Sequence, residues 1–435
     1  MANAESLDQV LSIISTISNE CDENSPIHIF IGRDTRPHSL HLSELVLKGA
    51  EGMGANVIDL GEVTTPQLHF AVQSANHELS KLIEQRGDAI DKISMEAFTV
   101  FKNIDIRKTI DKYHECLAEG FIDYISTLEI SNVPNLQMSK LILDASYGVG
   151  SISSENFMKV LKGKLDDILV LEKEFSYGGG LINVNKNGLV LDSAKRVAEA
   201  ISGLELLLRN KAFEGPVNKD CGAELVQKQQ TPPCGVDPLK DVDHLMCSFD
   251  GDADRIVFHS FKKRLEDSKE FDWVLFDGDK IASISAVVIV NELNEAFPVA
   301  NEFSLGCVQT AYANGASTKF LRDQKVPVVF AKTGVKYLHH KAESYDIGIY
   351  FEANGHGTVM FSKAILDRLE SEIPKLYDVY PLNRQQIAIK RLYAISRFVN
   401  QAVGDALSDM LLVLASLKVY FYTLKNKYIL TKSIY

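Results

Sequence analysis

Apolar runs typical of β-strands alternate with segments of helical spacing along most of this chain. Residues 27–34, 56–66 and 141–150 each run from apolar residues into a polar or glycine-containing turn. Residues 40–55 and 110–128 have the apolar spacing of amphipathic helices. This alternation predicts repeated α/β units with parallel or mixed sheets. In such sheets, ligands bind at the loops beyond the carboxyl ends of the strands.

Three later apolar runs, at 244–261, 326–340 and 347–357, also lead into polar loops. All three loops are therefore expected at the ligand-binding edges of their sheets. Residues 172–218 interrupt the alternation, because a triple-glycine turn is followed by a helix-like stretch at 192–210. We interpret this segment as an insertion. Its glycines lack the G-x-G-x-x-G spacing of a dinucleotide site, which argues against such a site.

The composition limits the class of protein. A chain of 435 residues, 46% of them hydrophobic, is long enough for two or three domain cores. A net charge of −12 argues against a nucleic-acid partner, since such proteins need a basic surface. The six cysteines include no C-x-x-C pair, and the first residues lack the basic region of a secretion signal. These features predict a cytoplasmic protein.

The most apolar run of the chain lies near its end, at residues 410–424. Lys418 interrupts this run, which is also shorter than the roughly 20 residues that a membrane-spanning helix needs. We therefore expect no membrane partner. The run is instead predicted to be a core or interface helix without the part of the protein that would pack over it, so that it exposes apolar surface.

Three carboxylates stand within five positions at Asp250, Asp252 and Asp254, directly followed by Arg255. A solvated acidic turn is the simpler reading of such a cluster. At the end of an apolar strand, however, this spacing can direct all three carboxylates at one divalent cation such as Mg²⁺. An EF-hand is excluded because Arg255 and Phe261 occupy the positions of its glycine and glutamate. Arg255 is then placed to contact a phosphate.

Two further loops have ligand-binding character. In FEANGHG, residues 351–357, the glycines permit close approach of the backbone to a ligand, while Glu352 and Asn354 offer an acceptor and an amide to sugar hydroxyls. In KTGVK, residues 332–336, Lys336 offers a cation to a phosphate. The alternatives are a plain glycine turn for the first loop and an ordinary exposed helix start for the second.

Taken together, the motifs resemble the phosphoacetylglucosamine mutase family of the α-D-phosphohexomutase superfamily. The motifs that carry the resemblance are GRDTRP (32–37), TTPQLH (64–69), CSFDGDADR (247–255), VQTAYANGAS (308–317), KTGVK with LHHKA (332–342), FEANGHG (351–357) and GDALSDM (404–410). The resemblance implies an isomerase that interconverts N-acetylglucosamine 6-phosphate and N-acetylglucosamine 1-phosphate, on the route to UDP-N-acetylglucosamine. The implied partner is a small amino-sugar phosphate.

The resemblance also implies domains and residue roles. It divides the chain into a partial first domain (1–135), a metal-binding domain (136–272, with the insertion), a sugar-binding domain (273–395) and a linker with a divergent tail (396–435). Asp250, Asp252 and Asp254 would ligate Mg²⁺. The implied catalytic residues are Arg255 and Lys336. The implied substrate-binding residues are Thr333, Gly334, Glu352, Asn354, Gly355 and His356.

Two motifs of the family do not occur in these 435 residues: the T-A-S-H-N-P loop of the nucleophilic serine and the R-P-S-G-T-E phosphate loop of a fourth domain. The expectation from the sequence is a chain truncated at both ends and inactive by itself. Two alternatives stay open, namely a non-catalytic remnant that binds metal and sugar phosphate, and a hexose-phosphate mutase.

Overall fold

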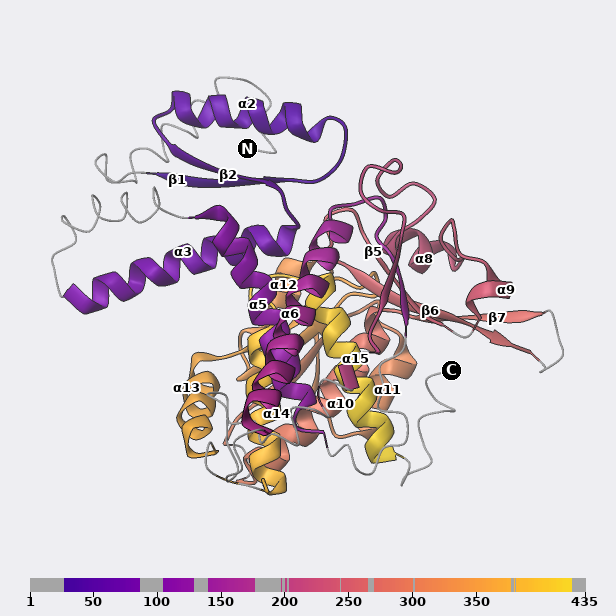
Figure 1. Ribbon diagram of the computed structural model, residues 1–435. Coiled ribbons are helices and arrows are strands. Elements are labelled where there is room, and N and C mark those ends of the chain that lie inside the picture. Colours follow the sequence, from indigo (N-terminus) through magenta and orange to yellow (C-terminus); the bar gives the residue numbers. More distant parts are fainter. Residues whose placement is uncertain are drawn as a thin grey trace.

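In the computed structural model, the described residues form three β-sheets. A group of long helices lies at the centre (Figure 1). The structure describes residues 27–86, 105–128, 140–176, 197, 200–201, 203–242, 244–264, 270–299, 302–376, 379 and 381–424. Parallel and antiparallel strand pairs both occur, with helices connecting the strands. The architecture confirms the predicted α/β class.

The first sheet consists of β1 (His28–Arg33) and β2 (Asn56–Glu62), which pair in parallel. Helix α2 (Ser39–Gly52) connects the two strands, as parallel pairing requires a crossover. It lies on one side of the sheet, whereas α3 (Thr65–Arg86) lies on the other (Figure 1). The strands and the connecting helix confirm the pattern predicted for this part of the sequence.

The second sheet has five strands in the order β4-β3-β5-β6-β7. Their bounds are β3 (Leu141–Asp144), β4 (Leu206–Arg209), β5 (Leu245–Phe249), β6 (Ile256–Lys263) and β7 (Phe271–Phe276). β3 pairs in parallel with β4 and β5, whereas β6 pairs antiparallel with β5 and β7. The sheet is therefore mixed, and its strand β3 is buried along its whole length.

Strand β4 corrects one prediction from the sequence. The helical pattern of residues 192–210 does not continue to its end, because residues 206–209 pair with β3 as a strand. Three consecutive leucines begin this strand, and such a run has no polar residue to distinguish a strand from a helix. Residues 200–201 are helical. The predicted triple-glycine turn at 178–180 lies outside the described residues.

The third sheet has the order β11-β10-β8-β9. Its strands are β8 (Leu305–Thr310), β9 (Val328–Ala331), β10 (Ile347–Phe351) and β11 (Gly357–Phe361). β8 pairs in parallel with β9 and β10, and β11 pairs antiparallel with β10. The connecting helices are α11 (Gly315–Asp323) and α12 (Val335–Ala342). The polar loops after β9 and β10 thus lie beyond strand carboxyl ends, as predicted.

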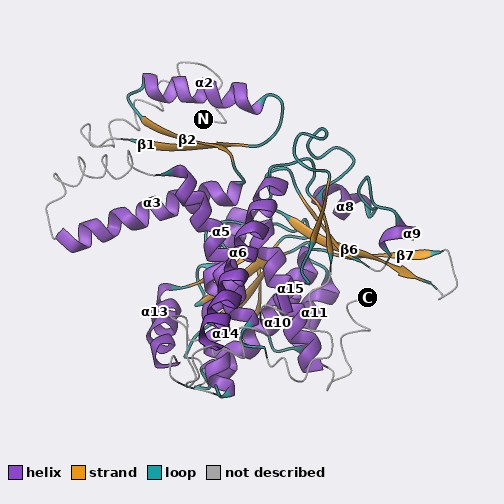
Figure 2. Ribbon diagram, in the orientation of Figure 1, coloured by secondary structure: helices purple, strands orange, loops and turns teal. Residues whose placement is uncertain are grey.

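Long helices pack together in the middle of the molecule (Figure 2). They are α5 (Ile106–Ile125), α6 (Gly150–Ser176), α10 (Gly278–Ala296), α14 (Arg384–Phe398) and α15 (Ala406–Leu424). Shorter helices in the described part of the chain include α8 (Ala223–Gln229), α9 (Pro238–Asp241), α13 (Lys363–Glu372) and a 3-10 helix (Ile373–Leu376). Helix α14 contacts both α5 and α10, so segments far apart in the sequence share one core.

A buried ion pair joins two of these helices. Arg391 Nη1 on α14 lies 2.7 Å from Glu292 Oε1 on α10, and the two side chains are only 14% and 10% exposed. Arg391 Nε also donates a hydrogen bond of 2.9 Å to the hydroxyl of Thr127. Removal of one partner from such a pair leaves the other charge buried without compensation.

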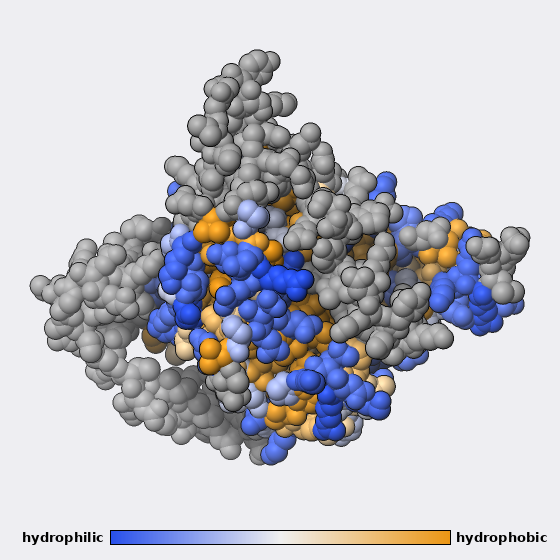
Figure 3. Space-filling view, turned by 90° about the horizontal axis from the view of Figure 1, so that it is seen from below, coloured by the Kyte–Doolittle hydropathy of each residue, from blue (hydrophilic) through white to orange (hydrophobic). Residues whose placement is uncertain are grey.

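Helix α15 corrects a second prediction. Met410, Leu411 and Leu412 are fully buried, because α5, α10 and β6 cover this helix. The expected exposure of the apolar run is therefore wrong over the side chains that the structure describes. No described helix is long and apolar enough to cross a membrane. The described part of the face in Figure 3 carries apolar atoms interspersed with hydrophilic ones.

Candidate functional site

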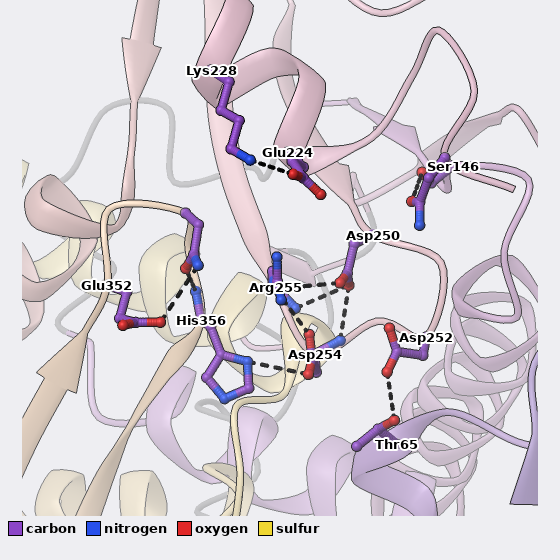
Figure 4. A network of polar contacts seen from close by, with 12 residues as sticks. Thr65, Ser146, Glu224, Lys228, Asp250, Asp252, Asp254, Arg255, Glu352 and His356 are labelled. Atoms are coloured by element: carbon purple, nitrogen blue, oxygen red, sulfur yellow. Dashed lines mark hydrogen bonds and ion pairs between the residues drawn. The ribbon is translucent and has the colours of Figure 1, made fainter. Parts of the chain in front are cut away.

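The acidic loop follows β5 and turns the chain into β6. One carboxylate oxygen from each of Asp250, Asp252 and Asp254 lies within 4.8 Å of the others (Figure 4). Asp250 Oδ1 shapes the turn by accepting hydrogen bonds from the backbone amides of Asp254 (3.1 Å) and Arg255 (3.2 Å). Ala253 adopts a left-handed conformation with φ of 59°. The structure thus brings the three predicted carboxylates together.

The pKa values of two of these groups reflect the crowding. Burial raises the pKa of Asp250 well above its ordinary value, and the charges of Asp254 and Asp252 raise it further. Burial acts on Asp254 in the same direction, but the hydrogen bond and charge of His356, together with Asp250 and the charge of Arg255, outweigh it and lower the pKa of Asp254. A divalent cation among these oxygens would favour the ionised form of every carboxylate.

The donor set fits such a cation. Asp254 Oδ1 is buried and accepts no hydrogen bond from the described residues, although Arg255 Nε lies 3.5 Å away, so a lone pair of this oxygen lacks a hydrogen-bond donor. Hard cations such as Mg²⁺ prefer carboxylate oxygens and keep further coordination positions for water or phosphate. The loop therefore has the chemistry of a magnesium site.

The second loop connects β10 to β11. Asn354 Oδ1 accepts the backbone amide of His356 at 3.0 Å, and the amide of Glu352 donates to the carbonyl of His356 at 2.9 Å. Glu352 Oε1 accepts the backbone amide of Gly334 at 3.2 Å. These hydrogen bonds fix the loop as a closed turn and attach the KTGVK segment to it.

A glycine is required where this loop meets the acidic loop. Gly355 has a φ of +88°, which L side chains rarely adopt. A Cβ atom built on Gly355 would lie 1.9 Å from the carbonyl oxygen of Ile256. The close approach allows the amide of Ile256 to donate to the carbonyl of Gly355 at 3.2 Å.

Side chains complete the junction between the two loops. His356 Nδ1 lies 3.2 Å from Asp254 Oδ2, and the backbones of Arg255 and His356 form a β-bridge. The Nε atom of Arg255 lies 3.5 Å from Asp254 Oδ1 and 3.6 Å from Asp250 Oδ2. His356 Nε2 is buried and has no hydrogen-bond partner among the described residues. The two loops, from different sheets, therefore form one continuous site (Figure 4).

The KTGVK segment lies at the start of α12. Gly334 precedes the helix with a φ of 113° and contacts Glu352 through its amide. Thr333 and Lys336 are exposed. The structure thus connects this segment to the second loop through Gly334, while the predicted roles of Thr333 and Lys336 stay predictions.

The acidic loop also contacts Thr65, a residue that was not predicted from the sequence to belong to the site. The hydroxyl of Thr65 donates a hydrogen bond of 2.6 Å to Asp252 Oδ2, and the amide of Thr65 donates one of 3.1 Å to the carbonyl of Asp252. The only signal for it in the sequence is the TTPQLH motif, which by itself does not indicate the partner.

A buried acidic pair lies behind the acidic loop. The backbone amide of Ala406 donates to the carbonyl of Ala253 at 3.0 Å, which ties the start of α15 to the loop. Next to this contact, Asp405 accepts the hydroxyl of Tyr113 at 2.9 Å, and burial raises the pKa of Asp405 to about 6. Asp409 is fully buried, and neither of its carboxylate oxygens has a hydrogen-bond partner within the described ranges.

Comparison with protein families gives two matches along this chain. Residues 277–422 match the model described as phosphoacetylglucosamine mutase AMG1, domain III. Residues 2–83 match the model described as phosphoglucomutase/phosphomannomutase, alpha/beta/alpha domain I. The first match includes the FEANGHG loop and most of α15.

Curated proteins that resemble the chain carry the same description. The chain is 35% identical to phosphoacetylglucosamine mutase of Oryza sativa subsp. japonica, over 98% of this chain and 65% of that protein. It is 33% identical to phosphoacetylglucosamine mutase of Homo sapiens, over 98% of this chain and 64% of that protein. The chain thus spans slightly less than two thirds of the length of these relatives.

Solved structures of N-acetylglucosamine-phosphate mutases also superimpose on this chain. N-acetylphosphoglucosamine mutase of Aspergillus fumigatus, in complex with GlcNAc-6P and magnesium, superimposes with a TM-score of 0.66 at 27% identity. The superposition covers 95% of this chain and 67% of that chain. A product complex of N-acetylglucosamine-phosphate mutase superimposes with a TM-score of 0.68 at 28% identity, over 96% and 64% of the two chains.

Proposed function

We propose that this chain, which belongs to the phosphoacetylglucosamine mutase family, binds Mg²⁺ and an N-acetylglucosamine phosphate at its two joined loops. The reaction served by this site is the interconversion of N-acetylglucosamine 6-phosphate and N-acetylglucosamine 1-phosphate, on the route to UDP-N-acetylglucosamine. The junction between Asp254 and His356 carries the proposal, because it joins the acidic loop, to which we assign the metal, to the FEANGHG loop, to which we assign the sugar hydroxyls. The Aspergillus relative that was solved with GlcNAc-6P and magnesium supports it.

In this proposal, Asp250, Asp252 and Asp254 hold Mg²⁺. The bound ion supplies positive charge that offsets the negative charge on a transferring phosphoryl group. Arg255 lies beside the same carboxylates and presents its guanidinium group to the phosphate. A planar guanidinium can donate two parallel hydrogen bonds to phosphate oxygens.

The second loop holds the sugar. Glu352 and Asn354 contact backbone amides of this region, which fixes their side chains, and the Glu352 carboxylate retains further lone pairs for sugar hydroxyls. The backbone of Gly355 allows a close approach of the ligand. His356 is oriented by Asp254 through Nδ1, and we assign it to the substrate because its buried Nε2 has no hydrogen-bond partner among the described residues.

The KTGVK segment provides the remaining contacts in this proposal. The amide of Gly334 is already engaged by Glu352, so Thr333 and Lys336 are the groups left to reach the phosphate of the substrate. Their exposed positions at the start of α12 leave them accessible to an anion. Lys336 provides the cation that this otherwise acidic chain needs near an anionic substrate.

For the 435-residue polypeptide by itself, we propose binding without turnover. Phosphoryl transfer between two oxygens of a sugar needs a nucleophile that is phosphorylated and then regenerated. The tetrapeptide S-H-N-P, which carries this nucleophile in the family, does not occur in the sequence. The metal and sugar loops orient a substrate but do not carry the phosphoryl group themselves.

Isothermal titration calorimetry with Mg²⁺ and then with N-acetylglucosamine 6-phosphate tests the proposal. We expect both to bind, and we expect Asp252→Asn to weaken Mg²⁺ binding strongly because it removes a charged ligand. The matched control is Asp367→Asn, an exposed aspartate of α13 that pairs with Lys363. Equal Mg²⁺ affinity in wild type and Asp252→Asn would contradict the metal site. Interconversion of the two phosphates that is abolished in Asp252→Asn would contradict binding without turnover.

A further inference from the structure

Thr65 connects the first sheet to the acidic loop. Its hydroxyl lies 2.6 Å from Asp252 Oδ2, and its amide donates to the carbonyl of the same residue at 3.1 Å. Thr65 and Asp252 are 187 positions apart in the sequence, and Thr65 begins α3 whereas Asp252 follows β5. One residue thus holds both the side chain and the backbone of a proposed metal ligand, and Figure 4 shows the side-chain contact.

The local sequence fixes Thr65 at the start of α3. The amide of Thr64 donates to Gln67 Oε1 at 2.9 Å, and the amide of Gln67 donates to the hydroxyl of Thr64 at 3.2 Å. Such a reciprocal pair, with threonine and glutamine three positions apart, is a capping box. Pro66 lacks an amide hydrogen and is tolerated in this first turn. Thr65 therefore sits in a rigid helix start rather than in a free loop.

A buried contact anchors this helix start to the central helices. Gln67 Nε2 lies 3.3 Å from His114 Nε2 on α5, and the same ring nitrogen lies 3.1 Å from the hydroxyl of Ser153 on α6. Burial lowers the pKa of His114 to about 4, so the ring is neutral near pH 7 and can accept these hydrogen bonds. All three side chains are buried.

A second contact attaches the same part of the chain nearby. The hydroxyl of Thr35, in the loop after β1, donates to the carbonyl of Tyr147 at 3.0 Å. The next residue, Gly148, lies close to the backbone of the acidic loop. A Cβ atom built on Gly148 would lie 2.3 Å from the carbonyl oxygen of Gly251. The first sheet therefore meets the acidic loop and its neighbour at two points.

We propose that Thr65 is a positioning residue for the metal site. From its place at the start of α3, beside the first sheet, Thr65 orients the Asp252 carboxylate. The inference rests on the proposed magnesium site. Ligating carboxylates are commonly held by hydrogen bonds from residues around them, and loss of such a partner typically lowers metal affinity about 10- to 100-fold. With one oxygen engaged by Thr65, the carboxylate cannot rotate freely, so its orientation toward the other two aspartates is set before the ion arrives.

The test compares Mg²⁺ affinity in four chains by isothermal titration calorimetry: wild type, Thr65→Val, Thr65→Ser and the control Thr109→Val. Valine keeps the shape of threonine but removes the hydroxyl, and serine keeps the hydroxyl. We expect Thr65→Val to bind Mg²⁺ about 10- to 100-fold more weakly, and Thr65→Ser to bind nearly as wild type does. The hydroxyl of Thr109 donates to the carbonyl of Asp105 on an exposed part of α5, so its variant should bind normally.

Thermal unfolding of each variant separates positioning from folding. The proposal requires that Thr65→Val lose affinity while its unfolding midpoint stays near that of wild type; if valine unfolds the chain, Thr65→Ala replaces it in the same comparison. Equal affinity in wild type and in the hydroxyl-free variant would overturn the inference and leave the metal site in place. An equal loss in Thr65→Ser would also overturn it, because the hydroxyl would then not be the cause. Absence of Mg²⁺ binding by wild type would overturn the proposed site itself.

Discussion

Replacement of Asp409 by asparagine should change how the stability of this protein depends on pH. Asp409 is fully buried on α15, and its two carboxylate oxygens lack hydrogen-bond partners among the described residues. Burial raises the pKa of Asp409 well above its ordinary value, and the charge of Asp405 raises it further. In the folded chain, Asp409 therefore keeps its proton at a pH where the unfolded chain has lost it.

The size and sign of the change in the free energy of unfolding follow from this proton, which the folded chain keeps. Above the ordinary pKa of an aspartate, about 4, the folded chain binds one proton more than the unfolded chain, so the free energy of unfolding decreases by about 1.4 kcal/mol per pH unit. The decrease continues until the pH passes the raised pKa of Asp409. Wild type should therefore lose stability through this group as the pH rises from the ordinary pKa of an aspartate toward the raised pKa of Asp409. An asparagine side chain cannot ionise, so Asp409→Asn should lack this part of the decrease.

Urea unfolding of wild type and of Asp409→Asn at pH 5, 6 and 7 measures the difference. We expect the stability of the variant relative to wild type to increase as the pH rises, by up to about 1.4 kcal/mol per pH unit. The control is Asp367→Asn, which makes the same change of side chain at an exposed position of α13. Parallel pH profiles for wild type and Asp409→Asn would refute the reasoning, since Asp409 would then be ionised in the folded chain.

Two further changes test other parts of the structure. Glu352→Ala should weaken binding of N-acetylglucosamine 6-phosphate by about 1.5–3 kcal/mol, as is usual for hydrogen bonds to charged groups; unchanged affinity by calorimetry would mean that FEANGHG is only a turn. Arg391→Met should lower the free energy of unfolding by about 3–5 kcal/mol, because it leaves the buried Glu292 without its cation. A loss below about 1 kcal/mol in urea unfolding would instead be typical of a surface pair.

Local patterns were sufficient for much of the fold. β1, β5 and β10 are short apolar runs that end in polar turns, and both features lie within a few residues of sequence. The pattern fails at β4, where a run of leucines carries no periodicity and only pairing with β3 specifies a strand. It also fails for the burial of α15, because the elements that cover it come from distant segments.

The same distinction applies to the site. Asp250, Asp252 and Asp254 are close in sequence, so their spacing alone predicts that their carboxylates can meet. Thr65 could not be assigned in this way, since its partner is 187 positions away. The contact between Asp254 and His356 likewise depends on how two sheets pack, which no local pattern specifies.

The position of Asp254, between the metal loop and His356, has a thermodynamic consequence. Its Oδ2 atom contacts the imidazole of His356, while its Oδ1 atom lies 3.5 Å from Arg255 Nε. Any change that a ligand in one loop makes to the affinity of the other loop must be matched by an equal change in the reverse direction, because binding free energies form a closed cycle. If bound Mg²⁺ increases the affinity for the sugar phosphate, bound sugar phosphate increases the affinity for Mg²⁺ by the same factor. If the proposed function holds, the level of amino-sugar phosphate then sets how many chains carry metal when the ion is scarce.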